Sequence, residues 1–177
     1  MVADETRISI EANPYYVWHI KGQTPIKKKR LEIHKGKTIF GALSMRTGKV
    51  IHSISRHKKA LGAINLLKQV KKFKDKYYGQ DSNNKILLIW DNISCHKSKE
   101  VKQWLRENPG IIELDNFPPY SPEMNPIEHV WKVLKKAINH LRGEAALTEI
   151  MQQARGFLKS NIFDYQLLGL DKVSIFK

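Results

Sequence analysis

Cysteine is almost absent from this sequence, since Cys95 is the only one in 177 residues. A single cysteine excludes an intramolecular disulfide, which is the usual stabilising link of small secreted domains. We therefore predict a protein of the reducing cytoplasm, in which Cys95 is chemically inert.

Long apolar runs and targeting signals are missing as well. The longest purely apolar run, Ile86 to Trp90, is far too short to cross a bilayer. The first residues, MVADETRIS, have neither the basic start nor the apolar centre of a signal peptide. Internal repeats and low-complexity segments are not found either. We expect a globular chain with no membrane partner.

Acidic side chains are scarce, because 17 Asp and Glu stand against 31 Lys and Arg and the formal net charge is +14. The cations are spread over segments that look folded, so nucleic acid is the expected partner, with a generic basic protein as the alternative. The hydrophobic fraction of 41% and the four Trp argue for a folded protein. The length predicts one domain over residues 1–177.

The hydrophobic pattern alternates between the two periods of secondary structure. The predicted strands are 2–10, in which one strand ends and a second begins, then 15–20, 37–45, 49–54, 85–90 and 111–114. The predicted helices are 60–73, 98–107, one that begins at Asn125-Pro126, and one near 147–158. We expect the KILLIW run at 85–90 to be a central strand covered on both faces. This order predicts an α/β fold, a mixed sheet with helices on its faces.

Three acids stand at the ends of these elements. Asp4 closes the first apolar segment, Asp91 follows KILLIW, and Glu128 lies in the first turn of its helix. Because chemistry in such sheets sits at the carboxyl ends of strands, we expect the three carboxylates to meet at one edge. Such a cluster needs cations, and two Mg²⁺ or Mn²⁺ ions there suit phosphoryl transfer on nucleic acid.

Two of these acids have alternatives. Asn-Pro-Ile-Glu is also a capping box, in which Glu128 binds only the backbone N–H of Asn125. On these residues alone, a metal ligand and a helix cap stay equally open for Glu128. Glu5 could be mistaken for the ligand in place of Asp4, but strand alternation predicts that the two side chains lie on opposite faces.

Two longer motifs resemble a known family. The segments IWDNISCHKSKEVKQWL and FPPYSPEMNPIEHVWKVLKK, preceded by ADET and by W-x-x-x-G-x-x-P at 18–25, resemble the catalytic domain of DDE-superfamily transposases. The most similar branch is the insertion-sequence branch of the Tc/mariner superfamily. The resemblance covers most of residues 2–142, and 36 residues lie between Asp91 and Glu128, near the spacing of that group.

The resemblance implies a ribonuclease H-like fold, a mixed β-sheet flanked by α-helices. It implies that Asp4, Asp91 and Glu128 are the catalytic residues and hold two Mg²⁺ or Mn²⁺ ions. The implied enzyme is a DDE-type transposase that nicks transposon ends and joins them to target DNA by transesterification. A catalytically inactive, sequence-nonspecific DNA-binding remnant and a ribonuclease H- or resolvase-like nuclease stay open as alternatives.

Weaker hypotheses concern residues around these acids. Asn92 could orient the neighbouring ligand or only shape a turn. For His96 we favour a structural hydrogen bond over a donor near the scissile phosphate, and we assign Trp131 to the core. The expected DNA-binding residues form two sets. Lys132 and Lys135 share the helix side of Glu128. The second set is a run of cations whose alternative interpretation is a solvated loop, namely Lys27, Lys28, Lys29 and Arg30.

The chain departs from the family at its start. Members usually carry an N-terminal helix-turn-helix region for the transposon ends, which we expect to be absent here because only Met1 to Ala3 precede Asp4 in this sequence. Residues 143–177 are expected to form a C-terminal helical extension. The expected partner is double-stranded DNA, both transposon ends and target, while a homodimer and a separate DNA-recognition polypeptide stay open. The expected location is the cytoplasm, at the nucleoid.

Overall fold

The computed structural model describes residues 1–11, 21–22, 35–56, 60–79, 83–91, 98–118, 121, 124–142 and 145–164. Its elements, in chain order, are β1 (Val2–Ser9), β2 (Gly36–Leu43), β3 (Val50–Ser55), α1 (Ala60–Tyr78), β4 (Ile86–Trp90), α2 (Lys99–Glu107), β5 (Ile112–Asn116), α3 (Ile127–Ile138), the 3₁₀ turn η2 (Asn139–Leu141) and α4 (Leu147–Ser160). The predicted α/β class is confirmed. The predicted strand at 15–20, the cation run Lys27 to Arg30, and Asn92 and His96 lie outside the described residues.

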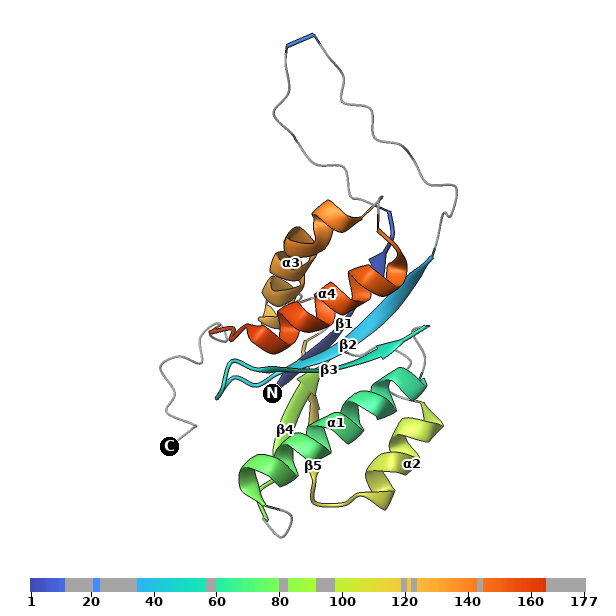
Figure 1. Ribbon diagram of the computed structural model, residues 1–177. Coiled ribbons are helices and arrows are strands. Elements are labelled where there is room, and N and C mark those ends of the chain that lie inside the picture. Colours follow the sequence, from blue (N-terminus) through green and yellow to red (C-terminus); the bar gives the residue numbers. More distant parts are fainter. Residues whose placement is uncertain are drawn as a thin grey trace.

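The strands of the described chain form one mixed sheet in the order β3-β2-β1-β4-β5. β2 runs antiparallel to both β1 and β3, whereas β4 is parallel to both β1 and β5. The hairpin between β2 and β3 turns at Gly48, whose φ of +64° is a left-handed conformation that glycine adopts without strain. α1 then crosses one face of the sheet, as a parallel connection requires, and leads into β4 (Figure 1).

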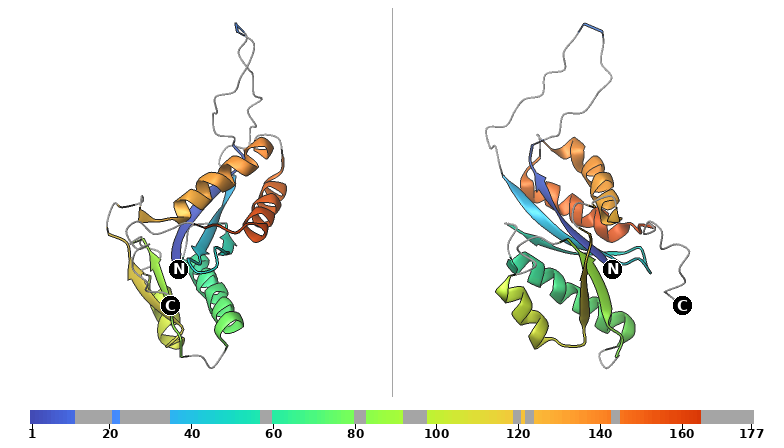
Figure 2. Two further views of the ribbon diagram at one scale, coloured as in Figure 1. Left: turned by 90° about the vertical axis from the view of Figure 1, so that its left-hand side faces the viewer. Right: turned by 180° about the vertical axis from the view of Figure 1, so that it is seen from behind.

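Helices cover both faces of this sheet (Figure 2). Side chains along β1 alternate between two cores, because Val2 and Ile8 pack with α3 and α4 while Ala3 packs with α1 and α2. The apolar stripe along α3, whose residues recur every three or four positions, is buried in the first of these cores as Ile127, Val130, Trp131, Leu134 and Ile138. The 3.6-residue period of that stripe therefore decides which side of α3 faces the sheet.

Local polar groups explain where helix α2 begins and ends. The Ser98 hydroxyl accepts a hydrogen bond from the Val101 N–H at 3.3 Å, which satisfies one of the free donors of the first turn. Asn108-Pro109-Gly110 then ends the helix, and Gly110 has a φ of +77°. Among the described residues, no helix combines the length and the apolar character that crossing a bilayer requires.

Two predictions about the strands are wrong. Asp4 does not end the first strand, because β1 continues from Val2 to Ser9 and every one of its residues has a partner on β2. Pairing between strands uses backbone groups, so the polar side chains that suggested a break do not interrupt β1. β4 is central in the sheet but is not covered on both faces, since Leu87 is 42% exposed. The reason is that α3 packs on β1 and β2, so on that face of β4 Ile89 reaches the core under α3 while Leu87 stays exposed.

Candidate metal centre

The parallel pairing of β1 and β4 brings two of the predicted acids together. Val2 is level with Ile89, so two residues further along each chain segment Asp4 is level with Asp91. One carboxylate oxygen each from Asp4, Asp91 and Glu5 lie within 4.8 Å of one another, and all three residues are half-buried. Clustered carboxylate oxygens are the donors that Mg²⁺ and Mn²⁺ prefer.

Glu5 belongs to this group, although the sequence favours Asp4 over Glu5 as the metal ligand. Alternation along β1 was expected to separate its side chain from that of Asp4, and for their carboxylate oxygens this expectation is wrong. β4 ends at Trp90, so on the β4 side of β1 no described strand lies beside Glu5, and the longer side chain of Glu5 reaches the space next to Asp91. The direct succession of Asp4 and Glu5 is the sequence feature that could have indicated a carboxylate site shared by both.

Glu128 approaches the cluster from the first turn of α3 and is half-buried. Burial contributes most to raising the pKa of Asp4, and the negative charge of Glu128 contributes next, ahead of that of Glu5; together they raise it from 3.8 to about 7. Within the described residues, the group that falls inside 4.8 Å does not include Glu128. Glu128 therefore lies near Asp4 but outside the tightest part of the cluster.

Trp131 connects the core of α3 to the Asp4 carboxylate. Its Nε1–H donates a hydrogen bond to Oδ2 of Asp4 at 2.9 Å, and this bond lowers the pKa of Asp4, against the larger effects that raise it. Trp131 is buried, as predicted, but its indole N–H also orients an acid of the site. The apolar period of the helix indicates burial and carries no information about where the N–H points.

Asn125 fixes the start of α3 against β1. Its side chain is 5% exposed, its Nδ2 donates to the Ala3 carbonyl at 3.3 Å, and its Oδ1 accepts from the Ile127 N–H at 3.4 Å. The second of these contacts satisfies a donor of the first turn of α3, although the helix begins at Ile127, with Pro126 rather than Asn125 at the N-cap position. Among the described residues no hydrogen bond runs back from the Glu128 carboxylate to Asn125, and only the Glu128 backbone N–H bonds the Asn125 carbonyl. Helix capping therefore does not occupy the Glu128 carboxylate.

Gly41 makes room for Trp131 on the face of the sheet that carries Asp4, its direct partner across β1 and β2. A Cβ added to Gly41 would lie 2.5 Å from Cη2 of Trp131 and 2.9 Å from Cζ2. Because a buried indole cannot yield easily, we expect Gly41→Ala to lower the free energy of unfolding by about 1–3 kcal/mol. Urea unfolding followed by tryptophan fluorescence measures this loss.

A matched control for that change is Gly156→Ala on α4. Nothing lies within 4 Å of a Cβ added at Gly156, so this substitution should be neutral or should stabilise the helix by up to about 1 kcal/mol. Equal unfolding midpoints for the two variants would contradict the tight fit between Gly41 and Trp131.

Lys132 and Lys135 follow Glu128 along the same side of α3. The side chain of Lys132 is exposed and that of Lys135 is half-buried. Positive charge thus continues from the acidic cluster along the helix surface, where a polyanion can reach it.

Comparisons with known proteins agree on one family. A family model described as DDE superfamily endonuclease matches residues 1–149. The chain is 30% identical over 163 residues to the insertion element IS630 uncharacterized 39 kDa protein of Shigella sonnei, covering 88% of this chain and 44% of that protein. It is 39% identical over 56 residues to the transposable element Tcb2 transposase of Caenorhabditis briggsae, covering 32% of this chain and 19% of that protein. The chain spans less than half the length of these curated relatives.

Solved structures share the fold. Mos1 transposase in a paired-end complex with the left transposon end superposes with a TM-score of 0.65 at 15% identity, covering 92% of this chain and 48% of that one. The Mos1 transposase catalytic domain solved with raltegravir and Mn gives a TM-score of 0.60 at 15% identity, covering 92% of this chain and 71% of that one. These likenesses confirm the ribonuclease H-like fold. Because the family model spans residues 1–149, this chain belongs to the DDE superfamily of endonucleases, with an insertion-element protein and a Tc1 transposase among its relatives.

Proposed function

We propose that this chain is a transposase catalytic domain that nicks DNA at transposon ends and transfers the cut strand to target DNA, with Asp4, Asp91 and Glu128 as metal ligands. The observation that carries the proposal is the group of carboxylate oxygens, those of Asp4 and Asp91 included, within 4.8 Å of one another. Family membership supports the class of reaction, since the matching model describes endonucleases and the curated relatives include transposases.

The donor set fits a divalent cation. Carboxylate oxygens are hard ligands, and the repulsion that raises the pKa of Asp4 is of the kind that a bound cation would relieve. Mos1 paired-end complexes solved with Mn and with Mg support the choice of metal. We propose two ions, which when bound supply Lewis-acid stabilisation to the attacking and leaving oxygens of a phosphodiester.

Residues of the chain itself position the acids and the DNA. Trp131 orients the Asp4 carboxylate, and Asn125 holds the first turn of α3, and with it Glu128, against β1. Lys132 and Lys135 would bind phosphates beside the acids, which fixes where the scissile bond lies without reading sequence.

Nicking of a supercoiled plasmid tests this function, because it does not depend on recognition of a transposon end. We expect the chain to convert supercoiled DNA to open circles in Mn²⁺ or Mg²⁺, and not in EDTA. DNA binding without cleavage in either metal would contradict the proposal and favour the inactive DNA-binding remnant. Preferential cleavage of the RNA strand of an RNA–DNA hybrid would also contradict it and favour a ribonuclease H-like nuclease.

Glu128 and Glu5 compete for the place of third ligand, and paired substitutions separate them. We expect Glu128→Gln to slow the initial rate of nicking by about 10²-fold or more, because loss of a metal-binding oxyanion removes a few kcal/mol of transition-state stabilisation. We expect Glu5→Gln to slow nicking by less than about tenfold. Each variant is the control for the other, because both keep the side-chain shape and remove one charge. The reverse order of effects would transfer the role to Glu5.

A further inference from the structure

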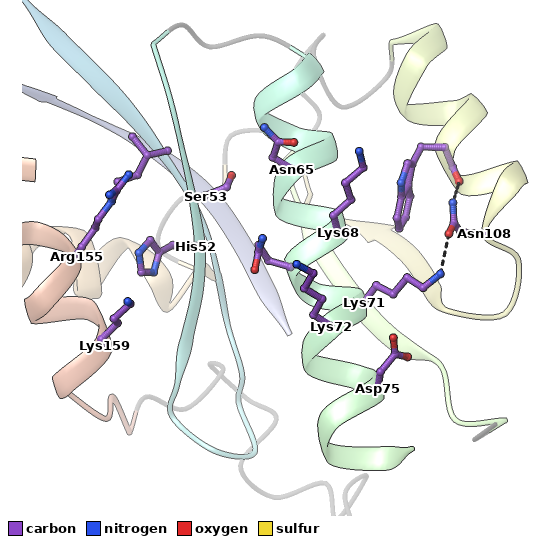
Figure 3. A pocket seen from close by; sticks show the side chains of 13 residues that line it. His52, Ser53, Asn65, Lys68, Lys71, Lys72, Asp75, Asn108, Arg155 and Lys159 are labelled. Carbon is purple, nitrogen blue, oxygen red and sulfur yellow. Dashed lines mark hydrogen bonds between the residues drawn. The ribbon is translucent and has the colours of Figure 1, made fainter. Parts of the chain in front are cut away.

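A basic groove runs along β3, two strands away from β1 and its acids. It is a cavity of about 800 Å³ whose floor is the edge strand β3 and whose walls are α1, the C-terminal end of α2, and α4 (Figure 3). Five cations line it, namely Lys68, Lys71, Lys72, Arg155 and Lys159. Asp75 is the one carboxylate among the described residues that line it. We call this cavity the β3 groove.

The cations of the β3 groove come from one face of each helix. Lys68, Lys71 and Lys72 are spaced three and four residues apart on α1, and Arg155 and Lys159 are four apart on α4. Figure 3 shows the two sets on opposite sides of β3. Like charges at these spacings repel one another and destabilise the helix. An anion bound between the two sets would reduce this repulsion and so stabilise the folded chain.

One of the lysines is held in place. Nζ of Lys71 donates to Oδ1 of Asn108 at 3.1 Å, and Nδ2 of Asn108 donates to the Trp104 carbonyl at 2.9 Å (Figure 3). An ammonium group has three N–H donors, so Lys71 keeps two donors for a ligand while its position is set in advance. A charge that is ordered before binding loses less side-chain entropy when an anion arrives.

The floor of the β3 groove offers backbone donors. The Ser44 N–H donates to the Lys49 carbonyl at 2.9 Å, and antiparallel pairs alternate between bonded and non-bonded. The register therefore turns the backbone N–H groups of His52 and Ile54 away from β2, toward the open edge. Burial lowers the pKa of His52, and the charges of Arg155 and Lys159 lower it further, so the positive field reaches this floor.

We propose that the β3 groove binds the phosphodiester backbone of duplex DNA, as a contact surface separate from the metal centre. Cations on the α1 and α4 walls and N–H donors on the floor match the oxygens of a phosphate chain. The same features give an apolar or cationic peptide little to bind. The groove would hold DNA without regard to sequence, and it would do so whether or not the chain cleaves DNA.

Charge-reversal pairs test the groove through the affinity for a labelled duplex in EDTA, measured by fluorescence anisotropy over a series of salt concentrations. We expect Lys68→Glu with Lys72→Glu, and separately Arg155→Glu with Lys159→Glu, to weaken binding at least about tenfold near 0.1 M salt. The slope of log K against log salt should fall by about two in each pair. The control pair, Lys99→Glu with Lys102→Glu on α2, changes the net charge equally at exposed residues outside the groove.

Binding that falls only in the groove pairs supports the proposal, even if the chain never nicks a plasmid. Equal losses in the groove and control pairs would overturn it, because overall charge would then explain binding. Unchanged DNA binding together with altered sedimentation would also overturn it and assign the open β3 edge to a second copy of the chain. If charge reversal prevents folding, as judged by circular dichroism, Lys68→Gln with Lys72→Gln repeats the test.

Discussion

Asp91→Asn is expected to slow metal-dependent nicking by at least about 10³-fold. Asp91 shares the 4.8 Å group with Asp4, and its amide replacement keeps the shape but removes the charge that would hold a cation. Loss of several kcal/mol of electrostatic stabilisation at a phosphoryl transition state corresponds to a rate loss of about this size. Initial rates of plasmid nicking in Mn²⁺, compared with the wild-type chain, measure the effect.

The matched control for this change is Asp115→Asn. Asp115 lies on β5, the strand next to β4, is exposed, and is not a member of the acidic group. We expect its variant to cut at the wild-type rate, and we expect both variants to bind duplex DNA in EDTA as the wild type does. If Asp91→Asn cuts as fast as Asp115→Asn, the acidic cluster is not the catalytic centre, whatever the family resemblance.

The metal-free chain is expected to lose stability as the pH rises from about 4 to 7, because of Asp4. Its pKa is 3.8 in an unfolded chain and about 7 in the fold, so the folded state binds the extra proton across this window. The contribution of Asp4 to stability is therefore fully present below pH 4, falls as the pH approaches 7, and levels off above it, with a total loss on the order of a few kcal/mol. For a chain of this size, this corresponds to a fall in Tm of about 5–10 °C.

Asp4→Asn isolates this effect, because an amide has the same shape and cannot ionise. We expect the Tm of the variant minus that of the wild type to increase from pH 5 to pH 8 in EDTA. Mn²⁺ at pH 8 should raise the Tm of the wild type and leave that of the variant nearly unchanged. Parallel Tm curves for the two chains over this pH range would mean that burial and neighbouring charges do not raise the pKa of Asp4.

Much of the secondary structure could be predicted because the signal is local. The stripe on α3, the hairpin around Gly48 and the short run at Ile86–Trp90 each report on the burial of one segment, and each element was found. The predictions that are wrong concern contacts between segments far apart in the chain. Leu87 is exposed because of where α3 lies, and Asp4 lies inside β1 because of pairing with β2. A periodic pattern within one segment carries no information about the placement of α3 or the pairing of β1 with β2.

The acidic cluster was predictable in part, since Asp4 and Asp91 were expected to converge at one sheet edge and their carboxylates do meet. The presence of Glu5 among them was not expected, because it depends on β4 ending beside it. The bond from Trp131 to Asp4 was not expected either, since a buried indole looks the same in sequence whichever way its N–H points. Both details contribute to the pKa of Asp4, behind burial and the charge of Glu128, and both follow only from packing.

By itself the amino-acid sequence determined the excess of positive charge, the types of element and the motifs of the DDE superfamily, because these depend on composition and on short-range spacing. Only the tertiary structure decided which side chains become neighbours. Glu5 joins Asp91, Gly41 makes room for Trp131, and the cations of α1 face those of α4 across β3. The physical reason is that strand register and helix placement are fixed by contacts between segments far apart in the chain, whose energies no single segment contains.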